Sequence, residues 1–311
     1  MSVLVVGSFM TDLVARTNFS PTPGQTVIGN SFGTYLGGKG ANQAVASKRA
    51  GSKTYMVGAL GDDSLGNNFL NFFKQSGFDP HHIVIKPNQV SGVGHIVINE
   101  NTGQNQIIII PGANLLFNRS DLLKYQNLFE EVSIVVNQLE MDDDIVIASK
   151  ELALKHNKLY LLNPAPYKKL PDHVLKGIDF ITPNETELAA FVGKDELTTM
   201  EDFQKASQEL INKGIKNVIT TLGEKGAMHC DKHGCTIYPA FEDKIVIDTV
   251  AAGDAFNGTF AAMIDQGLAI NEAVIYANAA GALTTTKKGA IPSIPTIQEI
   301  KAFIAKHQVD K

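Results

Sequence analysis

Residues 248–258 of the 311-residue chain read Asp248-Thr249-Val250-Ala251-Ala252-Gly253-Asp254-Ala255-Phe256-Asn257-Gly258. The apolar residues before this stretch predict a strand over residues 244–247, and the small residues within it predict a helix that runs to about Gly267. A strand, a tight turn and a helix start suggest an α/β fold. The unpaired N–H groups of a first helical turn attract an anion, and the small side chains at 251–253 let a ligand approach the backbone.

The rest of the chain repeats this strand and helix rhythm. Helical patterns end at glycines, for example residues 65–73 before Gly77 and residues 202–211 before Gly214. Short apolar runs lie at residues 4–6, 134–136, 159–162, 180–181 and 218–221. Such alternation predicts an α/β domain with a mainly parallel central sheet flanked by helices.

Two stretches break the rhythm and resemble antiparallel strand pairs, residues 24–36 and 91–110. We expect them to pair as a small, discontinuous β-sheet lid, spanning about 13–36 and 91–111, on a single domain of residues 1–311. The apolar run at 107–110 would be an aggregation hazard on a free edge, so a covering helix or a partner subunit is expected there.

Composition narrows the class of protein. The 44% hydrophobic content excludes a disordered chain, and a formal charge of −5 gives no basic face for nucleic acid or a membrane surface. The N-terminus resembles no signal peptide, so a cytoplasmic protein is expected. Two cysteines are too few for a disulfide framework.

Asp254 is a carboxylate in the first turn of the expected helix. It could accept a proton from an attacking hydroxyl while the neighbouring N–H groups stabilise phosphoryl oxygens. Taken alone, it is more simply a carboxylate that satisfies the first N–H groups of its helix.

The segment from Asp248 to Gly258 resembles the C-terminal signature of ribokinases, within the phosphofructokinase B superfamily, although many members have glycine at the position of Ala251. The resemblance implies that Asp254 is a catalytic base and that Ala251, Ala252 and Gly253 form an anion hole. It further implies a ribokinase-like fold and ATP-dependent phosphorylation of D-ribose on its 5-hydroxyl to D-ribose 5-phosphate.

A second glycine-rich segment reads Gly37-Gly38-Lys39-Gly40-Ala41-Asn42-Gln43. It is not a P-loop, because Gly40 stands where a P-loop needs a Ser or Thr for its metal. A structural turn would explain it, but it resembles the sugar-binding signature of ribokinases. The residues at sugar-contacting positions of that family are Asp12, Gly38, Lys39, Asn42, Glu140 and Asp254.

Met10 departs from the family pattern, which often has a short polar residue two positions before Asp12. A thioether is only a weak hydrogen-bond acceptor and cannot donate, so a deoxy sugar would be penalised less at this site. The alternatives are therefore a 2-deoxy-D-ribose kinase, a kinase for another furanose or a nucleoside, or a catalytically inactive sugar-binding regulator. The regulator would have no need of Asp254.

Asn184 and Glu187 match the N-x-x-E motif of the superfamily, which helps to place Mg²⁺, through bound waters because Mg²⁺ dehydrates reluctantly. Helix capping alone would explain Asn184 but not Glu187. Positions near ATP in the family are matched by Asn184, Thr221, Gly223, Gly226, Gly253 and Asn278.

A loop at residues 288–293 resembles one that binds an activating K⁺ in the family. The residues that match the cation positions are Asp248, Val250, Thr284, Lys287, Gly289 and Ser293. The resemblance also implies a homodimer through the lid.

Residues 229–235 contain two histidines and two cysteines, but the spacing lacks a second ligand pair, so a hairpin turn is a better interpretation than zinc. Asp62 and Asp63, beside Gly61, are interpreted as a helix-capping turn rather than a metal site.

Overall fold

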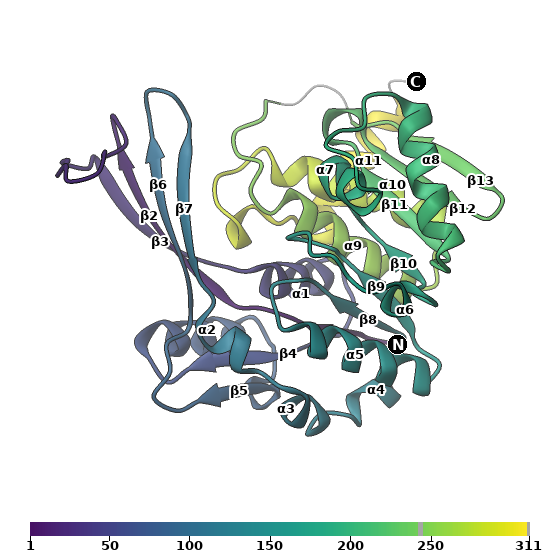
Figure 1. Cartoon of the computed structure of the whole chain (residues 1–311), viewed down its shortest axis with the longest axis horizontal. Coiled ribbons are helices and arrows are strands. Elements are labelled where there is room, and N and C mark those ends of the chain that lie inside the picture. Colours follow the sequence, from purple (N-terminus) through teal and green to yellow (C-terminus); the bar gives the residue numbers. More distant parts are fainter. Residues whose placement is uncertain (242–244, 310–311) are drawn as a thin grey trace.

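The computed structural model describes residues 1–241 and 245–309, which form two separate β-sheets and surrounding helices (Figure 1). The larger sheet has nine strands in the order β13-β12-β11-β10-β9-β8-β1-β4-β5, and only β12 and β13 pair antiparallel to their neighbours. The strands are β1 (Val3–Val6), β4 (Thr54–Gly61), β5 (Ile83–Lys86), β8 (Ile134–Asn137), β9 (Leu159–Leu162), β10 (Phe180–Ile181), β11 (Asn217–Thr221), β12 (Ala227–Asp231) and β13 (Gly234–Tyr238). The mainly parallel sheet is as predicted.

Helices cover both faces of this sheet because its central strands are apolar on both sides. In β1, Leu4 and Val6 pack into one hydrophobic core, and Val3 and Val5 pack into the other. The first core is closed by α3 (Arg119–Leu123), α4 (Leu128–Glu131), α5 (Asp143–Lys155), α6 (Asp172–Leu175), α7 (Glu185–Phe191) and α8 (Met200–Asn212). The second is closed by α1 (Lys39–Arg49), α2 (Ser64–Gln75), α9 (Ala252–Asp265), α10 (Ile270–Thr284) and α11 (Ile297–Val309). A strand buried on both faces is what a near-continuous apolar run predicts.

The smaller sheet has the order β3-β2-β6-β7 and projects from the body of the molecule (Figure 1). Its strands are β2 (Met10–Thr17), β3 (Ser31–Gly37), β6 (Gly92–Asn99) and β7 (Asn105–Ile110). The expected strand pair within residues 24–36 is wrong, because β3 pairs antiparallel with β2 instead. Residues 24–30 contain no strand. The two hairpins do join each other, through the parallel pair of β2 and β6.

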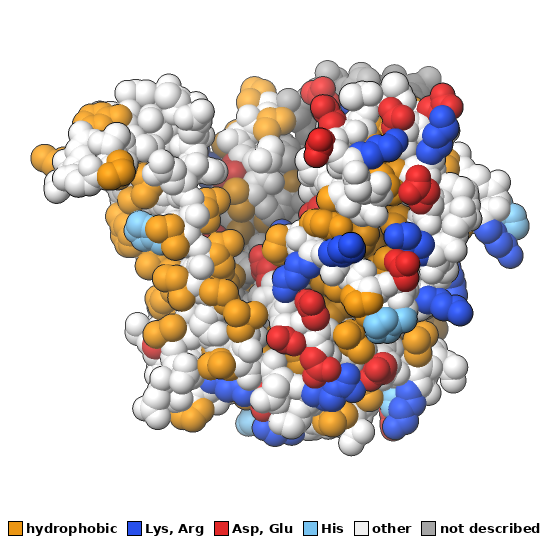
Figure 2. Space-filling view, in the orientation of Figure 1, with side chains coloured by type: hydrophobic (Ala, Val, Ile, Leu, Met, Phe, Trp, Pro, Cys, Tyr) orange, Lys and Arg blue, Asp and Glu red, His pale blue; other side chains and the backbone are white. Residues whose placement is uncertain are grey.

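Strand β7 leaves its apolar side chains in water. Ile107, Ile108, Ile109 and Ile110 are between 47% and 63% exposed, so within the described residues the expected covering helix is absent. Figure 2 shows apolar side chains gathered on the projecting lobe and a hollow between this lobe and the rest of the chain.

The strand expected over residues 244–247 is also corrected, in so far as it falls within the described chain, since Lys244 lies outside it. Residues 245–247 form no strand and are exposed. The N–H groups of Ile247 and Asp248 donate to the carbonyl of Thr285, so the end of α10 holds this segment in place of a sheet neighbour.

The strand order places the loops that carry the predicted site at the carboxyl ends of the parallel strands. The chain moves outward from β1 through β4 to β5 on one side and from β8 through β9 and β10 to β11 on the other. Parallel strands that diverge in this way open a crevice at their carboxyl ends, where ligands bind in α/β folds. Asp12, Glu140, Asn184 and Gly223 all follow carboxyl ends of these strands.

Within residues 1–241 and 245–309, none of the helices combines the length and apolar character needed to cross a membrane.

Candidate active site

The turn before α9 presents free backbone donors. Ala251 caps the helix with a left-handed backbone, at φ 63° and ψ 7°. This conformation disfavours a side chain and fits the glycine that many relatives were expected to have there. Within the described part of the chain, the N–H groups of Gly253 and Asp254 have no hydrogen-bond acceptor. The turn is therefore built to accept an anion.

Asp254 lies beside this turn and is 7% exposed. Its two carboxylate oxygens accept hydrogen bonds from two amides of α1, Oδ2 from Asn42 Nδ2 and Oδ1 from Gln43 Nε2, both at 2.9 Å. The C-terminal and N-terminal motifs, 212 residues apart, thus meet at one carboxylate. Gln43 was not among the predicted site residues, although it closes the glycine-rich motif.

Lys39 connects the two halves of the site electrostatically. Burial acts to lower the pKa of its ammonium group, but the carboxylates of Asp254, Glu140 and Glu187 outweigh burial and raise that pKa above its ordinary value. Lys39 is therefore a fixed positive charge among three predicted site carboxylates.

Glycines bring the start of α1 close to the end of β1. Gly38 precedes the helix at φ 89°, and a Cβ there would lie 2.6 Å from the backbone nitrogen of Met10. At Gly40 a Cβ would lie 2.4 Å from the backbone nitrogen of Ser8. Both distances are too short for a side chain, so this close backbone packing requires glycine.

Asp12 and Glu140 lie close enough for their charges to interact. Burial, and then the negative charge of Glu140, raise the pKa of Asp12 to about 6. Glu140 accepts hydrogen bonds from the Ser8 hydroxyl and, at 3.0 Å, from the Lys39 backbone N–H. Within the described residues, Asp12 and Glu140 Oε1 accept no hydrogen bond, so these oxygens suit a ligand that carries hydroxyl groups.

Met10 lies at the base of the small sheet and is 7% exposed. Its sulfur is 3.5 Å from Asn114 Nδ2. The same Asn114 amide donates to the carbonyls of Phe9 and Pro111, and its oxygen accepts from the Phe9 N–H. Met10 thus shares one face of β2 with Asp12 and meets a polar neighbour that already has stronger partners.

A hollow of about 990 Å³ lies next to the Asp254 turn. All six predicted nucleotide residues line it, namely Asn184, Thr221, Gly223, Gly226, Gly253 and Asn278. Sequence reasoning missed other lining residues, including Phe241, Phe256 and Thr249. Phe256 is in the quoted helix motif and could have been found there, whereas Phe241 follows β13 and carries no sequence signal.

The interpretation that capping cannot explain Glu187 is wrong. Asn184 Oδ1 accepts from the Glu187 N–H at 2.8 Å, and Glu187 Oε2 accepts from the Asn184 N–H at 2.9 Å. This reciprocal capping box at the start of α7 accounts for both residues. Burial and the charge of Asp254 nevertheless raise the pKa of Glu187, against the lowering effects of the Asn184 N–H and Lys39, so this carboxylate belongs to the electrostatics of the site.

Asp248 joins the two segments predicted to hold a monovalent cation. Its Oδ1 accepts from the Val250 N–H and its Oδ2 from the Gly289 N–H, both at 3.0 Å. Thr284 and Ser293 are fully buried nearby in the chain, but the Thr284 carbonyl accepts from the Lys287 N–H, and the Lys287 ammonium pairs with Glu299. The structure therefore brings Asp248, Val250 and Gly289 together, and Lys287 points its charge elsewhere.

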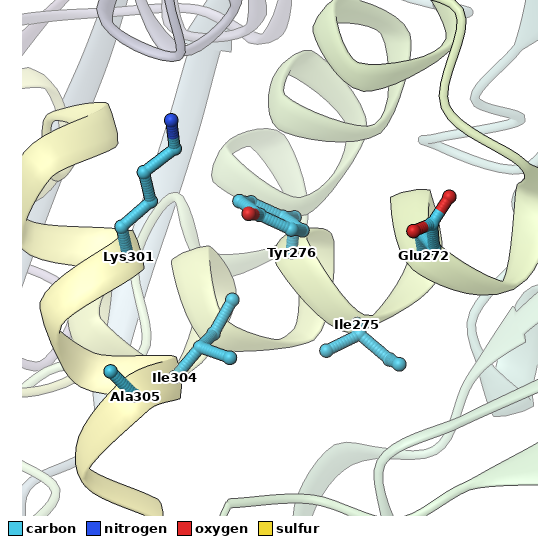
Figure 3. A pocket seen from close by; sticks show the side chains of 6 residues that line it. All are labelled: Glu272, Ile275, Tyr276, Lys301, Ile304 and Ala305. Carbon is cyan, nitrogen blue, oxygen red and sulfur yellow. The ribbon is translucent and has the colours of Figure 1, made fainter. Parts of the chain in front are cut away.

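A second hollow lies apart from this site. This smaller hollow of about 310 Å³ between α10 and α11 has Lys301 and Glu272 at opposite ends and Tyr276 between them (Figure 3). It contains none of the predicted site residues.

The expected hairpin at residues 229–235 is present, as β12 and β13. Its cross-strand cysteines, Cys230 and Cys235, form a disulfide, which the sequence analysis did not predict. No group of three or more potential metal-binding His, Cys, Asp or Glu side chains occurs within residues 1–241 and 245–309. Asp63 caps α2 by accepting from the Gly66 N–H, as predicted.

Comparison with known proteins identifies the chemistry of this fold. The model of the pfkB family carbohydrate kinases matches residues 1–297. The chain is 35% identical to a ribokinase of Haemophilus influenzae over 303 residues, covering 97% of this chain and 98% of the relative. It is also 35% identical to a deoxyribokinase of Salmonella typhimurium over 313 residues, covering 99% and 100%.

Solved structures give the same result. The ribokinase of Arabidopsis thaliana, solved with ribose and ATP, superimposes with a TM-score of 0.91 at 30% identity, covering 97% of this chain and 98% of the other. The ribokinase of Thermotoga maritima gives 0.87 at 32% identity, covering 98% and 99%. With a family match over nearly the whole sequence, this chain belongs to the pfkB family of carbohydrate kinases and is a sugar kinase with the ribokinase fold.

Proposed function

We propose that this sugar kinase transfers the γ-phosphoryl group of ATP to the 5-hydroxyl of D-ribose and forms D-ribose 5-phosphate. The observation that carries the proposal is the position of Asp254. It is a buried carboxylate beside free backbone N–H groups. It accepts a hydrogen bond from Asn42 of the glycine-rich motif, and its neighbour Gly253 lines the hollow of the predicted nucleotide residues.

In the proposed mechanism, Asp254 accepts the proton of the sugar hydroxyl, and the freed oxygen attacks the γ-phosphorus in line with the leaving ADP oxygen. In the turn of Ala251, Ala252 and Gly253, the free N–H group of Gly253 and that of the adjacent Asp254 stabilise the charge on the transferring group. The Ala252 N–H donates to the Thr249 carbonyl at 3.3 Å. Lys39 interacts electrostatically with Asp254, Glu140 and Glu187, and its positive charge would help to stabilise the negative charge of the transferring phosphoryl group.

Sugar hydroxyls would be held by Asp12, Asn42 and Glu140, with Gly38 and Lys39 at the turn. Asn42 Oδ1 is buried and has no partner within the described residues, which leaves an acceptor for a ligand hydroxyl. Buried polar groups without partners are costly, so a bound hydroxyl would stabilise this site.

Two metal roles fit the residues. One side-chain oxygen each of Asn184 and Glu187 accepts a hydrogen bond in the capping box, so these residues would hold Mg²⁺ through bound water rather than directly. Bound Mg²⁺ would neutralise charge on the ATP phosphates. The Gly289 N–H donates to the Asp248 carboxylate, so the two segments lie side by side, and backbone carbonyl oxygens from both would hold K⁺.

A second candidate substrate is 2-deoxy-D-ribose, and Met10 is the observation that favours it. The thioether lies on the Asp12 face of β2 and offers no donor to a hydroxyl, so the missing 2-hydroxyl of a deoxy sugar would leave no donor unpaired there. Relatives of both kinds are equally similar to this chain.

Coupled turnover measured with D-ribose, 2-deoxy-D-ribose, fructose and adenosine, at fixed MgATP and with or without K⁺, tests the proposal. The highest kcat/KM with D-ribose is expected. An equal or higher value with 2-deoxyribose would reassign the substrate, and replacing Met10 with Asn should then restore preference for ribose. Absence of turnover with all four would favour a sugar-binding regulator.

We also propose that the protein is cytoplasmic and that its small sheet is a lid that pairs with a second copy of this chain. The support is the exposed apolar side chains of β7, since a patch of this kind in a monomer risks aggregation. Analytical ultracentrifugation should find a dimer for the native chain and a monomer for Ile108→Lys. A native monomer across micromolar concentrations would contradict the proposal.

A further inference from the structure

A buried network of side-chain amides contacts Asp254, and none of its members lines the nucleotide hollow. Gln43 is fully buried and uses both hydrogens of its amide inside the protein, one on Asp254 Oδ1 at 2.9 Å and one on Asn163 Oδ1 at 3.0 Å. Its oxygen accepts from Gln138 Nε2 at 2.7 Å. Gln43 therefore has no donor left for a ligand.

The direction of every hydrogen bond in the network is determined by its ends. The Asp254 carboxylate can only accept when ionised, so the Gln43 nitrogen must face it. The Thr182 carbonyl can only accept, so the Asn163 nitrogen, at 3.1 Å, must face Thr182 and its oxygen must face Gln43. Gln138 must then donate to Gln43, which leaves Gln138 Oε1 buried without a partner in the described chain. The network thus keeps an amide N–H on Asp254 at the cost of an unsatisfied acceptor elsewhere.

The same network reaches the anion turn. The Thr182 hydroxyl donates to Asn257 Oδ1, and Asn257 Nδ2 donates to the Gly253 carbonyl at 2.8 Å. Asp254 and Gly253 therefore both accept hydrogen bonds from one connected set of buried side chains.

Gln43 differs from its neighbour Asn42 in what it can do. Asn42 keeps an oxygen without a partner in the described residues and was assigned to the sugar, whereas both amide hydrogens of Gln43 and its oxygen already bond to protein groups. We propose that Gln43 is a positioning residue, which fixes the plane of the Asp254 carboxylate so that its other oxygen faces the sugar hydroxyl. This inference rests on the proposed role of Asp254 as the base.

The test compares Gln43→Met with Gln138→Met and Asp254→Asn. Methionine keeps the length of glutamine but removes its hydrogen bonds, and Gln138→Met removes one bond of the same network without touching Asp254. The charged groups nearest Asp254, Lys39 and Glu187, are unchanged in both methionine variants.

Gln43→Met should lower kcat at least about tenfold and leave the KM values for pentose and ATP within about threefold, because the lost contact is with the base and not with a ligand. Gln138→Met should keep kcat within about threefold of the native enzyme. Its Tm should fall about as much as the Tm of Gln43→Met, because each variant removes buried hydrogen bonds of the same network.

Equal losses of kcat in the two methionine variants, or a rise in KM with native kcat in Gln43→Met, would overturn the inference while leaving the base role intact. Native turnover in Asp254→Asn would instead overturn the proposed function. If no sugar is turned over, crystal structures decide the question, because an unrotated Asp254 carboxylate in Gln43→Met contradicts positioning and a rotated one supports it.

Discussion

Strands β8 and β7 have similar apolar sequences and opposite surroundings. Ile134, Val135 and Val136 of β8 are fully buried at the centre of the nine-stranded sheet, whereas Ile108 and Ile109 of β7 are 63% and 57% exposed on the four-stranded one. The large sheet has helices on both faces and positions the proposed chemistry, while the small sheet contributes the carboxylate of Asp12 and the thioether of Met10 to the site. An apolar run therefore predicts a strand, but not whether that strand is core.

The largest effect should come from the large-sheet side of the site. Asp254→Asn should lower kcat about 10² to 10⁴-fold, because an amide cannot accept the hydroxyl proton. Sugar and ATP binding by calorimetry and the Tm should stay near native values. Turnover within tenfold of the native enzyme would show that the two sheets do not divide chemistry and substrate contacts in this way.

Ile134→Ala tests the core side of the comparison. Removing this fully buried side chain should lower the free energy of unfolding by about 2–5 kcal/mol, through lost apolar burial and the cavity left behind. Urea unfolding followed by circular dichroism measures it. A cost below about 1 kcal/mol would mean that the centre of the large sheet is less tightly packed than its burial indicates.

Asp12→Asn tests the one site carboxylate of the small sheet. The pKa of Asp12 is raised to about 6 in the folded protein, from 3.8, so the native state binds this proton more tightly than the unfolded chain does. The ionised group therefore costs stability that increases as pH rises from about 4 to 6 and persists at pH 7. At pH 7 the variant should be about 1–3 kcal/mol more stable and should have a higher KM for the sugar.

The native KM for the sugar should also rise as pH falls through 6, since a protonated Asp12 loses acceptor capacity, and the variant should lack this rise. Stability curves and KM values at pH 5 and pH 7 measure both effects. An Asp12→Asn variant less stable than the native protein at pH 7 would contradict a raised pKa for Asp12 in the folded protein.

Ile108→Ala should have the smallest effect. An exposed side chain of a monomer contributes little, so the free energy of unfolding should change by less than about 0.5 kcal/mol in dilute protein. Ile134→Ala, measured in parallel, is the matched control. A cost that grows with protein concentration would sharpen the comparison, because it would indicate that a second copy covers β7.

Local patterns in the sequence predicted much of this molecule. The buried strands, the helix of Asp254 and the hairpin at residues 229–235 each follow from periodicity and turn residues that lie within one segment. The motifs around Asn42, Asn184 and Gly223 likewise indicated candidate site residues through resemblance. These features depend on neighbours close in the chain, and short-range patterns record them.

Only the tertiary structure determined which distant groups meet. It paired β3 with β2, left residues 245–247 without a sheet neighbour, and joined Gln43 to Asp254 across 211 positions of sequence. It also placed Asp12 close enough to Glu140 for their charges to interact. Strand pairing, burial and electrostatic coupling depend on distances through space, and the linear order of residues does not contain those distances until the chain has folded.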